Sequence, residues 1–144
     1  KTGLSVAFFA VASDGTITVR KPNDYVSSMI ELAGGTYSLN GYVPEEENAL
    51  STLKMQMEDF YAAEKDADIL IYNGTIEGEL TSIAELVQKN SLFADFKAVK
   101  TGQVYTTGSN FYQQTSETCD FIEDLNKVLN GETDAEYRFL KKIN

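Results

Sequence analysis

Apolar residues along the chain form short unbroken runs that alternate with longer stretches of mixed character. Residues 4–12 are almost entirely apolar and favour β structure, which predicts a strand covered on both faces. Residues 17–19 predict a short second strand after a turn at Asp14-Gly15, where glycine tolerates positive φ. Residues 68–72 predict another core strand, after which Asn73-Gly74-Thr75 turns the chain.

Between these runs, apolar residues recur every three or four positions, which is typical of helices with one buried face. A first helix is expected from residue 23 or 24 to Gly34, because glycine readily takes the left-handed conformation that ends helices. A second helix is expected at about residues 52–65, with Glu58 on the side that faces solvent.

The second half of the chain predicts further helices and a pair of short strands. A capping box at Ser82 begins a third helix, and a fourth spans about residues 116–130. Short strands are expected at residues 97–99 and 103–106. Another capping box predicts a short terminal helix that ends at Leu140.

Strands and helices thus alternate from end to end of a chain of 144 residues, which is the length of one domain. The alternation predicts a three-layer α/β/α fold over residues 1–144, with helices on both faces of a central, mostly parallel sheet. In such domains ligands bind beyond the carboxyl ends of the strands. The loops at those ends are therefore expected to form the binding site.

The charge and composition disfavour several kinds of function. The chain carries 22 acidic and 12 basic residues, a net charge of -10, which argues against binding to nucleic acid or to anionic lipid. It has no histidine and one cysteine, so the commonest general base and an internal disulfide are both missing. No motif assembles a nucleophile with a base, and acids such as Glu58 fall where solvated charge is expected. We therefore expect neither an enzyme, nor a metal site, nor a bound cofactor.

Aromatic side chains are predicted at the ends of several strands and helices. They are Tyr42, Tyr72, Phe111 and Tyr112, and each either packs over the edge of the core or offers an apolar wall to a ligand. Hydroxyl and amide groups of the same loops would add hydrogen bonds to such a ligand. The candidate ligand-binding residues are Tyr42, Asn73, Gly74, Thr75, Ser109, Phe111 and Tyr112.

Three phrases in one order carry a resemblance to a known family. They are DYVSSMIELAGG at residues 24–35, DADILIYNGT at residues 66–75 and AVKTGQVYTT at residues 98–107, followed by a long amphipathic helix. Over essentially its whole length, the chain resembles the C-terminal lobe of the ABC-transporter substrate-binding proteins that capture ferric siderophores, haem and cobalamin (class III, helical backbone). That family has two α/β lobes joined by one long helix, with the ligand in the cleft between them. The resemblance implies that the N-terminal lobe and the connecting helix are absent from this chain.

The resemblance also implies a function and a set of partners. The chain would be part of the solute-binding component of an ABC importer, with an iron complex or cobalamin as ligand and the permease subunits as partners. In this family an exposed Glu at the start of the helix before the aspartate–aliphatic strand contacts arginines of the permease. Glu58 fits that place, and Glu45, Glu46 and Glu47 are rival candidates.

The chain departs from the best-marked siderophore binders of that family. Those proteins often place Arg and Trp in the cleft, whereas this chain has no Trp, and its arginines are Arg20 and Arg138. An anionic triscatecholate would therefore need cations from the missing lobe. Haem held by Tyr, cobalamin and a neutral hydroxamate complex are the other ligands that the resemblance leaves open.

A stand-alone interaction or sensing module of the same fold, without a small ligand, is the alternative interpretation. The transport interpretation and the stand-alone module predict different sequences upstream of Lys1. A secretion signal, a lipid-attachment cysteine and a first lobe favour transport, whereas a start codon close to Lys1 favours the module. The chain has no run of about 20 apolar residues that would span a membrane. The transport interpretation therefore places the protein outside the cytoplasm, in the periplasm or at the cell surface as a lipoprotein, with any anchor upstream.

Overall fold

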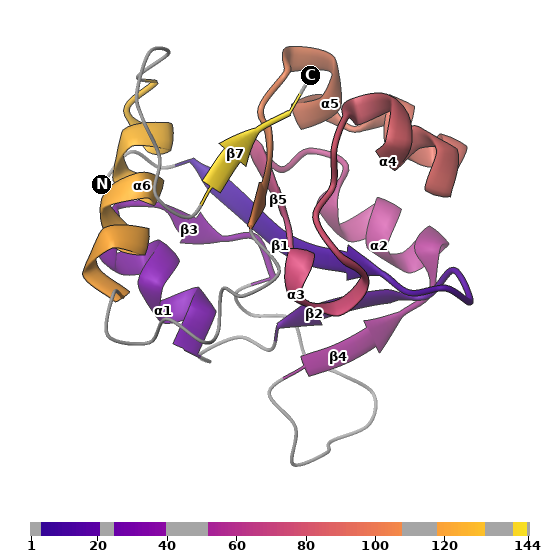
Figure 1. The fold of residues 1–144 in the computed structure, drawn as a ribbon, viewed down its shortest axis with the longest axis horizontal. Helices are drawn as coiled ribbons and strands as arrows, with labels where there is room; N and C mark the ends of the chain where they lie inside the picture. Colours follow the sequence, from indigo (N-terminus) through magenta and orange to yellow (C-terminus); the bar gives the residue numbers. More distant parts are fainter. Residues whose placement is uncertain (1–3, 21–24, 40–51, 108–117, 132–139, 144) are drawn as a thin grey trace.

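The computed structural model describes residues 4–20, 25–39, 52–107, 118–131 and 140–143 (Figure 1). These residues form one seven-stranded sheet with helices on both sides. The strands are β1 (Ser5–Val11), β2 (Ile17–Arg20), β3 (Thr36–Tyr37), β4 (Thr52–Met55), β5 (Ile69–Tyr72), β6 (Val104–Thr107) and β7 (Leu140–Lys142).

The strand order is β4-β2-β1-β5-β6-β7, and β3 also pairs with β1. Strands β3, β1, β5 and β6 pair in parallel, whereas β2, β4 and β7 join the sheet by antiparallel pairing. Because β4 is antiparallel to β2, only β2 and β7 of these strands run against the direction of β1. The fold is thus α/β with a mixed sheet of mostly parallel strands, as predicted.

Strand β1 is the centre of the sheet. One of its edges pairs with β5 along Val6 to Phe9. The other edge is shared, because β3 pairs with Ser5 and Val6 while β2 pairs with the last three residues of the strand. All residues from 6 to 11 are buried. This agrees with the unbroken apolar run, since a strand with helices on both faces has no solvent-facing side.

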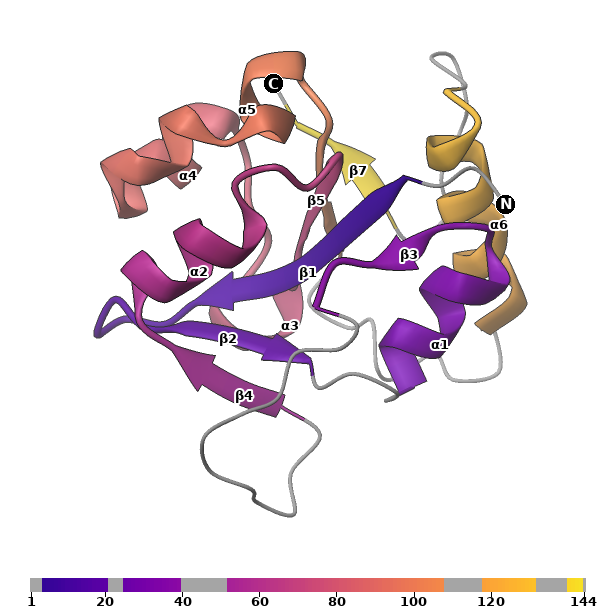
Figure 2. The ribbon, with the colours of Figure 1, turned by 180° about the vertical axis from the view of Figure 1, so that it is seen from behind.

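The helices divide into two layers. They are α1 (Tyr25–Leu32), α2 (Met57–Glu64), α3 (Gly74–Glu77), α4 (Ile83–Lys89), the 3-10 helix η1 (Ser91–Asp95), α5 (Lys97–Thr101) and α6 (Thr118–Leu129). Helices α1 and α6 lie together on one side of the sheet, and α2, α4 and α5 lie on the other (Figures 1 and 2). The Asn126 side chain donates to the Ala33 carbonyl and ties α6 to the end of α1. The predicted three-layer arrangement is confirmed.

Four buried phenylalanines form the core beneath α2 and η1. The Phe9 ring lies 5.1 Å from that of Phe60 and 5.6 Å from that of Phe93, between ring centroids. Phe96 lies 5.1 Å from Phe93 and 5.7 Å from Phe60. Each such pair contributes about 0.5–1.5 kcal/mol beyond the burial of its area. The cluster joins β1, α2 and the η1 segment into one unit.

Most predicted helix ends are confirmed. Gly34 has φ of 104° just after α1, and Gly131 has φ of 72° after α6. At the start of α4, the Ser82 hydroxyl accepts from the Glu85 amide at 3.1 Å. The Glu85 carboxylate accepts from the Thr81 amide at 3.0 Å, one residue earlier than the reciprocal bond of a capping box.

Three local predictions are wrong. The helix expected at residues 52–65 begins only at Met57, because residues 52–55 are β4, which extends the sheet by pairing with β2. Residues 97–99 belong to helix α5, which ends at Gly102 with φ of 78°. Leu140, the expected end of a terminal helix, begins β7 instead, and the rest of that predicted helix lies outside the described residues.

Candidate functional site

Strands β5 and β6 end side by side. Their register pairs Tyr72 with Thr106, so Asn73 and Thr107 follow at the same edge of the sheet. We call Asn73, Gly74, Thr75, Thr106 and Thr107 the carboxyl edge. Helix α3, which begins here, contacts both β1 and β6. In parallel sheets this is the edge where ligands bind.

Asn73 shapes the turn between β5 and α3. Its side-chain oxygen accepts from the Thr75 amide at 3.1 Å and from the Thr75 hydroxyl at 2.6 Å, so Asn73 is the N-cap of α3. Its own amide donates to the Phe9 carbonyl at 2.6 Å. Asn73 is only 4% exposed, whereas Thr75 is half-buried. The Asn73 oxygen therefore serves the turn, and Thr75 presents the more accessible side chain.

Gly74 allows β5 and β6 to finish in contact. Its amide donates to the Thr107 hydroxyl at 2.9 Å. A Cβ atom at Gly74 would lie 2.3 Å from the Thr107 carbonyl oxygen, which is closer than real Cβ atoms approach backbone. Glycine is therefore required here by the close approach of the two strand ends.

Thr106 and Thr107 were not among the predicted site residues. Both are fully buried, and the Thr106 hydroxyl accepts from the Leu80 amide at 3.2 Å. The Thr107 hydroxyl thus holds the first residue of α3, and the Thr106 hydroxyl holds the segment that follows α3. Two successive hydroxyl residues at the end of a predicted strand are the sequence signal that points to this role.

The predicted aromatic wall is only partly within the described residues. Tyr72 is 1% exposed, and its hydroxyl lies within hydrogen-bonding distance of the Val11 backbone, so it packs in the core. The other candidates, Tyr42, Ser109, Phe111 and Tyr112, lie outside the described residues, as do the acids Glu45, Glu46 and Glu47.

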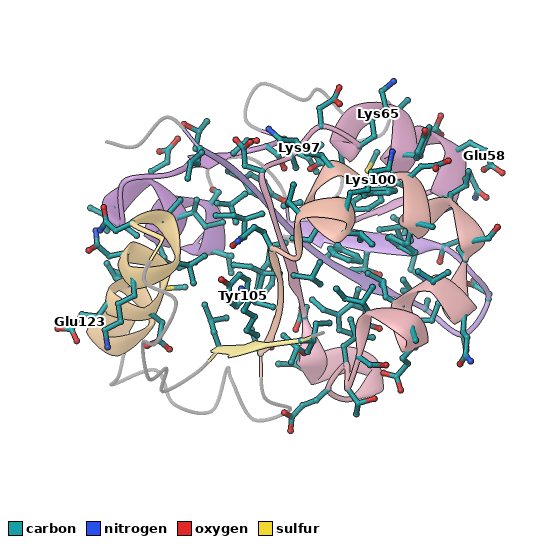
Figure 3. All side chains as sticks on the ribbon, turned by 90° about the horizontal axis from the view of Figure 1, so that it is seen from above. Glu58, Lys65, Lys97, Lys100, Tyr105 and Glu123 are labelled. Carbon is teal, nitrogen blue, oxygen red and sulfur yellow. The ribbon has the colours of Figure 1, made fainter. Side chains whose placement is uncertain are left out.

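Glu58 is exposed in the first turn of α2. It projects outward at one end of the molecule, and Glu123 of α6 projects at the other (Figure 3). Asp59, the next residue, is also exposed. Acidic side chains in the first turn interact favourably with the amide end of a helix. The start of α2 at Met57 thus places Glu58 nearer to the helix terminus than the sequence prediction did.

Asp68 lies just before β5 and connects the amino-terminal ends of β5 and β1. Its carboxylate accepts from the Ser5 amide at 2.9 Å and pairs with Lys97. Partial burial acts to raise the pKa of Asp68, but the hydrogen bonds from Lys97 and Ser5 outweigh it and lower the pKa. This arrangement connects β1, β5 and α5 and has a structural role.

Glu64 is the acid with the most perturbed environment among the described residues. It ends α2, is 1% exposed, and accepts a hydrogen bond at Oε2 from the Ser38 hydroxyl. Burial raises its pKa to about 7, although the bond from Ser38 acts to lower it. The Ser38 amide donates to the Val6 carbonyl near the start of β1, so this contact is separate from the carboxyl edge.

The described residues show neither a metal cage nor a membrane span. No group of three or more His, Cys, Asp and Glu side chains in this part of the chain is placed to hold a metal ion. Within the same residues, none of the helices is long and apolar enough to cross a bilayer.

No protein-family model matches this chain, and no curated protein matches it. Several solved structures do. A TroA-like periplasmic binding protein FepB from Veillonella parvula superposes with a TM-score of 0.69 and 13% identity, over 100% of this chain and 50% of that one. The siderophore periplasmic binding protein from the fuscachelin gene cluster of Thermobifida fusca has a TM-score of 0.64 and 18% identity, over 89% of this chain and 45% of that one.

The periplasmic haem-binding protein HutB of Vibrio cholerae is similar as well, with a TM-score of 0.61 and 12% identity, over 84% of this chain and 46% of that one. At these identities the likeness concerns the fold. This chain spans about half the length of each of these proteins. The chain therefore has the fold that makes up about half of the TroA-like siderophore- and haem-binding proteins.

Proposed function

We propose that this chain is the C-terminal lobe of a two-lobe solute-binding protein that delivers its ligand to an ABC importer. One observation carries the proposal: the whole chain superposes on about half of a TroA-like binding protein, and on similar shares of siderophore- and haem-binding proteins. The order of the three sequence phrases supports the C-terminal half, because the same order of phrases is what resembles that lobe.

The ligand in this proposal is an iron complex, either a ferric siderophore or haem, or else cobalamin. The similar structures are described as binding siderophore or haem, which supports the iron class. The ligand would contact the carboxyl edge through Thr75 and the Gly74 turn. Tyr42, Ser109, Phe111 and Tyr112, which follow β3 and β6 in the sequence, would add further contacts. The other half of the cleft would come from the N-terminal lobe.

The carboxyl edge suits a site of this kind for a physical reason. Asn73, Thr106 and Thr107 are buried. The side chains of Asn73 and Thr107 accept hydrogen bonds from the turn at Gly74 and Thr75, and the Thr106 hydroxyl accepts one from Leu80 after α3, so the backbone around Gly74 is held at both ends of α3. A preorganised edge loses little conformational freedom when a ligand binds. The Glu58 end of α2 would contact cationic residues of the permease. The protein would act outside the cytoplasmic membrane, as the periplasmic relatives do.

The test is ligand binding by the protein that contains both lobes. The chain is expressed with its natural upstream sequence and titrated with a ferric hydroxamate, a ferric catecholate, haem and cobalamin, following tyrosine fluorescence. A matched titration of free tyrosine corrects for light absorbed by the ligands. Saturable quenching by one class supports the proposal and names the ligand. Absence of saturable quenching by all four would contradict an iron-complex or cobalamin ligand and would favour either another solute or an interaction module of the same fold.

A further inference from the structure

The Glu64 carboxyl is buried between the end of α2 and the end of β3. The register of β1 and β3 pairs Val6 with Tyr37, so Ala7 and Ser38 are the next neighbours. The Ser38 amide continues this pairing by donating to the Val6 carbonyl at 2.9 Å. Because side chains alternate along a strand, Ala7 shares the face of Phe9, which is the face that α2 covers. Two small residues therefore leave room for an acidic side chain.

The carboxyl is only partly satisfied in this place. Glu64 is 1% exposed, and the Ser38 hydroxyl donates to Oε2. Among the described residues, Oε1 has no hydrogen-bond partner. A buried polar atom without a partner costs about 1–3 kcal/mol, and more when it is charged. The arrangement therefore tolerates a neutral carboxyl much better than a carboxylate.

The charged groups around Glu64 do not neutralise it. Lys65, the next residue, is exposed with its Nζ atom 5.9 Å from the centre of the Tyr61 ring. Lys97 pairs with Asp68, whose carboxylate is also held by Ser5 (Figure 3 shows Lys65 and Lys97). Asp66, in the turn after α2, is exposed and has the same sign as an ionised Glu64.

The strands beneath Glu64 supply no compensating charge. Residues 5–11 of β1 contain no ionisable side chain. In β3 the ionisable residue is Tyr37, which pairs with Val6 and so belongs to the opposite face. Among the described residues, the hydrogen bond from the Ser38 hydroxyl is thus what stabilises the Glu64 carboxyl.

We propose that Glu64 makes the attachment of residues 38–39 to α2 and β1 dependent on pH. With the carboxyl neutral, Ser38 is held against the end of α2 and Leu39 stays buried. Once the carboxyl loses its proton, the buried charge is relieved by local opening, which lets water reach it. This pH dependence belongs to the chain without ligand, so its test is independent of the proposed transport function.

The size of the effect follows from proton linkage. Burial raises the pKa of Glu64 from 4.5 to about 7. A local opening that exposes the carboxyl restores the lower pKa, so it releases a proton and is favoured as pH rises. Between pH 5 and pH 8 the equilibrium constant for such an opening increases by up to about 70-fold.

Amide hydrogen exchange of the Ser38 amide measures this opening, after correction for the intrinsic exchange rate at each pH. In wild-type protein the protection of Ser38 is expected to fall by tens of fold from pH 5 to pH 8. In Glu64→Gln it is expected to stay nearly constant. The exposed Glu123→Gln variant is the matched control and is expected to behave as wild type. The Leu70 amide, bonded to the Gln103 carbonyl, reports global unfolding for comparison.

Two results of the exchange experiment would overturn the proposal. One is a change of less than about threefold in the protection of Ser38 over this pH range. The other is equal protection of Ser38 and Leu70 at every pH, which would mean that the carboxyl is exposed only by global unfolding. A ¹³C titration of the Glu64 carboxyl needs no folded variant: a midpoint near 7 supports the proposal and one near 4.5 refutes it. Ser38→Ala should raise the midpoint further, because its hydroxyl stabilises the carboxylate.

Discussion

Gly74 and Thr107 bring the ends of β5 and β6 into backbone contact. The Gly74 amide donates to the Thr107 hydroxyl at 2.9 Å, and the Thr107 carbonyl oxygen occupies the space that any Cβ at position 74 would need. The start of α3 and the end of β6 are thereby fixed relative to each other. The geometry of the carboxyl edge therefore depends on this pair.

Gly74→Ala is expected to destabilise the protein by about 1–3 kcal/mol, because the added methyl group forces β5 and β6 apart. Ordinary helix propensity predicts the reverse sign, since Gly74 begins α3 and Ala favours helices by about 1 kcal/mol over Gly. Urea denaturation measures the difference. A variant that equals or exceeds wild type in stability would show that the close approach is easily relieved.

Thr107→Val is expected to cost about 1–3 kcal/mol, because it keeps the shape of the side chain but leaves the buried Gly74 amide without its acceptor. Thr107→Ser is the matched control, since it retains the hydroxyl and removes a methyl group. If Val proves no worse than Ser in urea denaturation, the hydrogen bond contributes little to this edge.

Glu64→Gln is expected to change how global stability depends on pH. The folded-state pKa of Glu64 is raised from 4.5 to about 7, so the folded protein binds the proton more tightly than the unfolded chain does. The contribution of Glu64 to wild-type stability should therefore fall as pH rises from about 4.5 to 7, by about 3 kcal/mol in all, and level off above 7. Glu64→Gln should lack this decline.

Urea denaturation at several values of pH from 4 to 8 separates the Glu64→Gln variant from wild type. Glu123→Gln, on an exposed face of α6, is the control and should follow the wild-type curve. Parallel curves for wild type and Glu64→Gln would mean that the carboxyl ionises freely in the folded state.

Asp68→Asn is expected to show the opposite pH dependence. The folded-state pKa of Asp68 is lowered below 3.8, so its stabilisation is present above that value and is lost as pH falls through the folded pKa. At pH 7 the variant should be less stable by about 1 kcal/mol, since Asn cannot pair with the Lys97 ammonium as a carboxylate does. Thermal unfolding at pH 7 and pH 3 tests this, and a constant difference would contradict it.

Glu58→Lys, in the protein that contains both lobes, is expected to leave ligand affinity unchanged and to reduce ligand-dependent stimulation of the importer ATPase by about tenfold or more. The reason is that reversal of an exposed charge opposes docking onto a cationic surface. Glu123→Lys makes the same change of charge on α6 and should have little effect. Equal losses in both variants would point to net charge rather than to a docking contact at Glu58.

The sequence alone determined the features that depend on local chemistry. The almost entirely apolar run at residues 4–12 indicated a strand covered on both faces, and Ser82 and Gly34 mark helix ends by their own side-chain and backbone properties. The α/β class and the position of Asn73-Gly74-Thr75 at the end of a core strand follow from the same kind of pattern.

Tertiary structure decided the features for which local preferences are ambiguous. Residues 52–55 became a strand because β2 offered an open edge, although Leu53 and Met57 also fit a helical spacing. Glu64 lies four residues after Phe60, on the buried side of α2, but only the position of β3 shows that Ser38 meets it there. Likewise, the contact of Gly74 with Thr107 joins residues 33 positions apart, and no local pattern encodes such a distance. Contacts of this kind arise only when the sheet is assembled, because its register selects which side chains and backbone groups become neighbours.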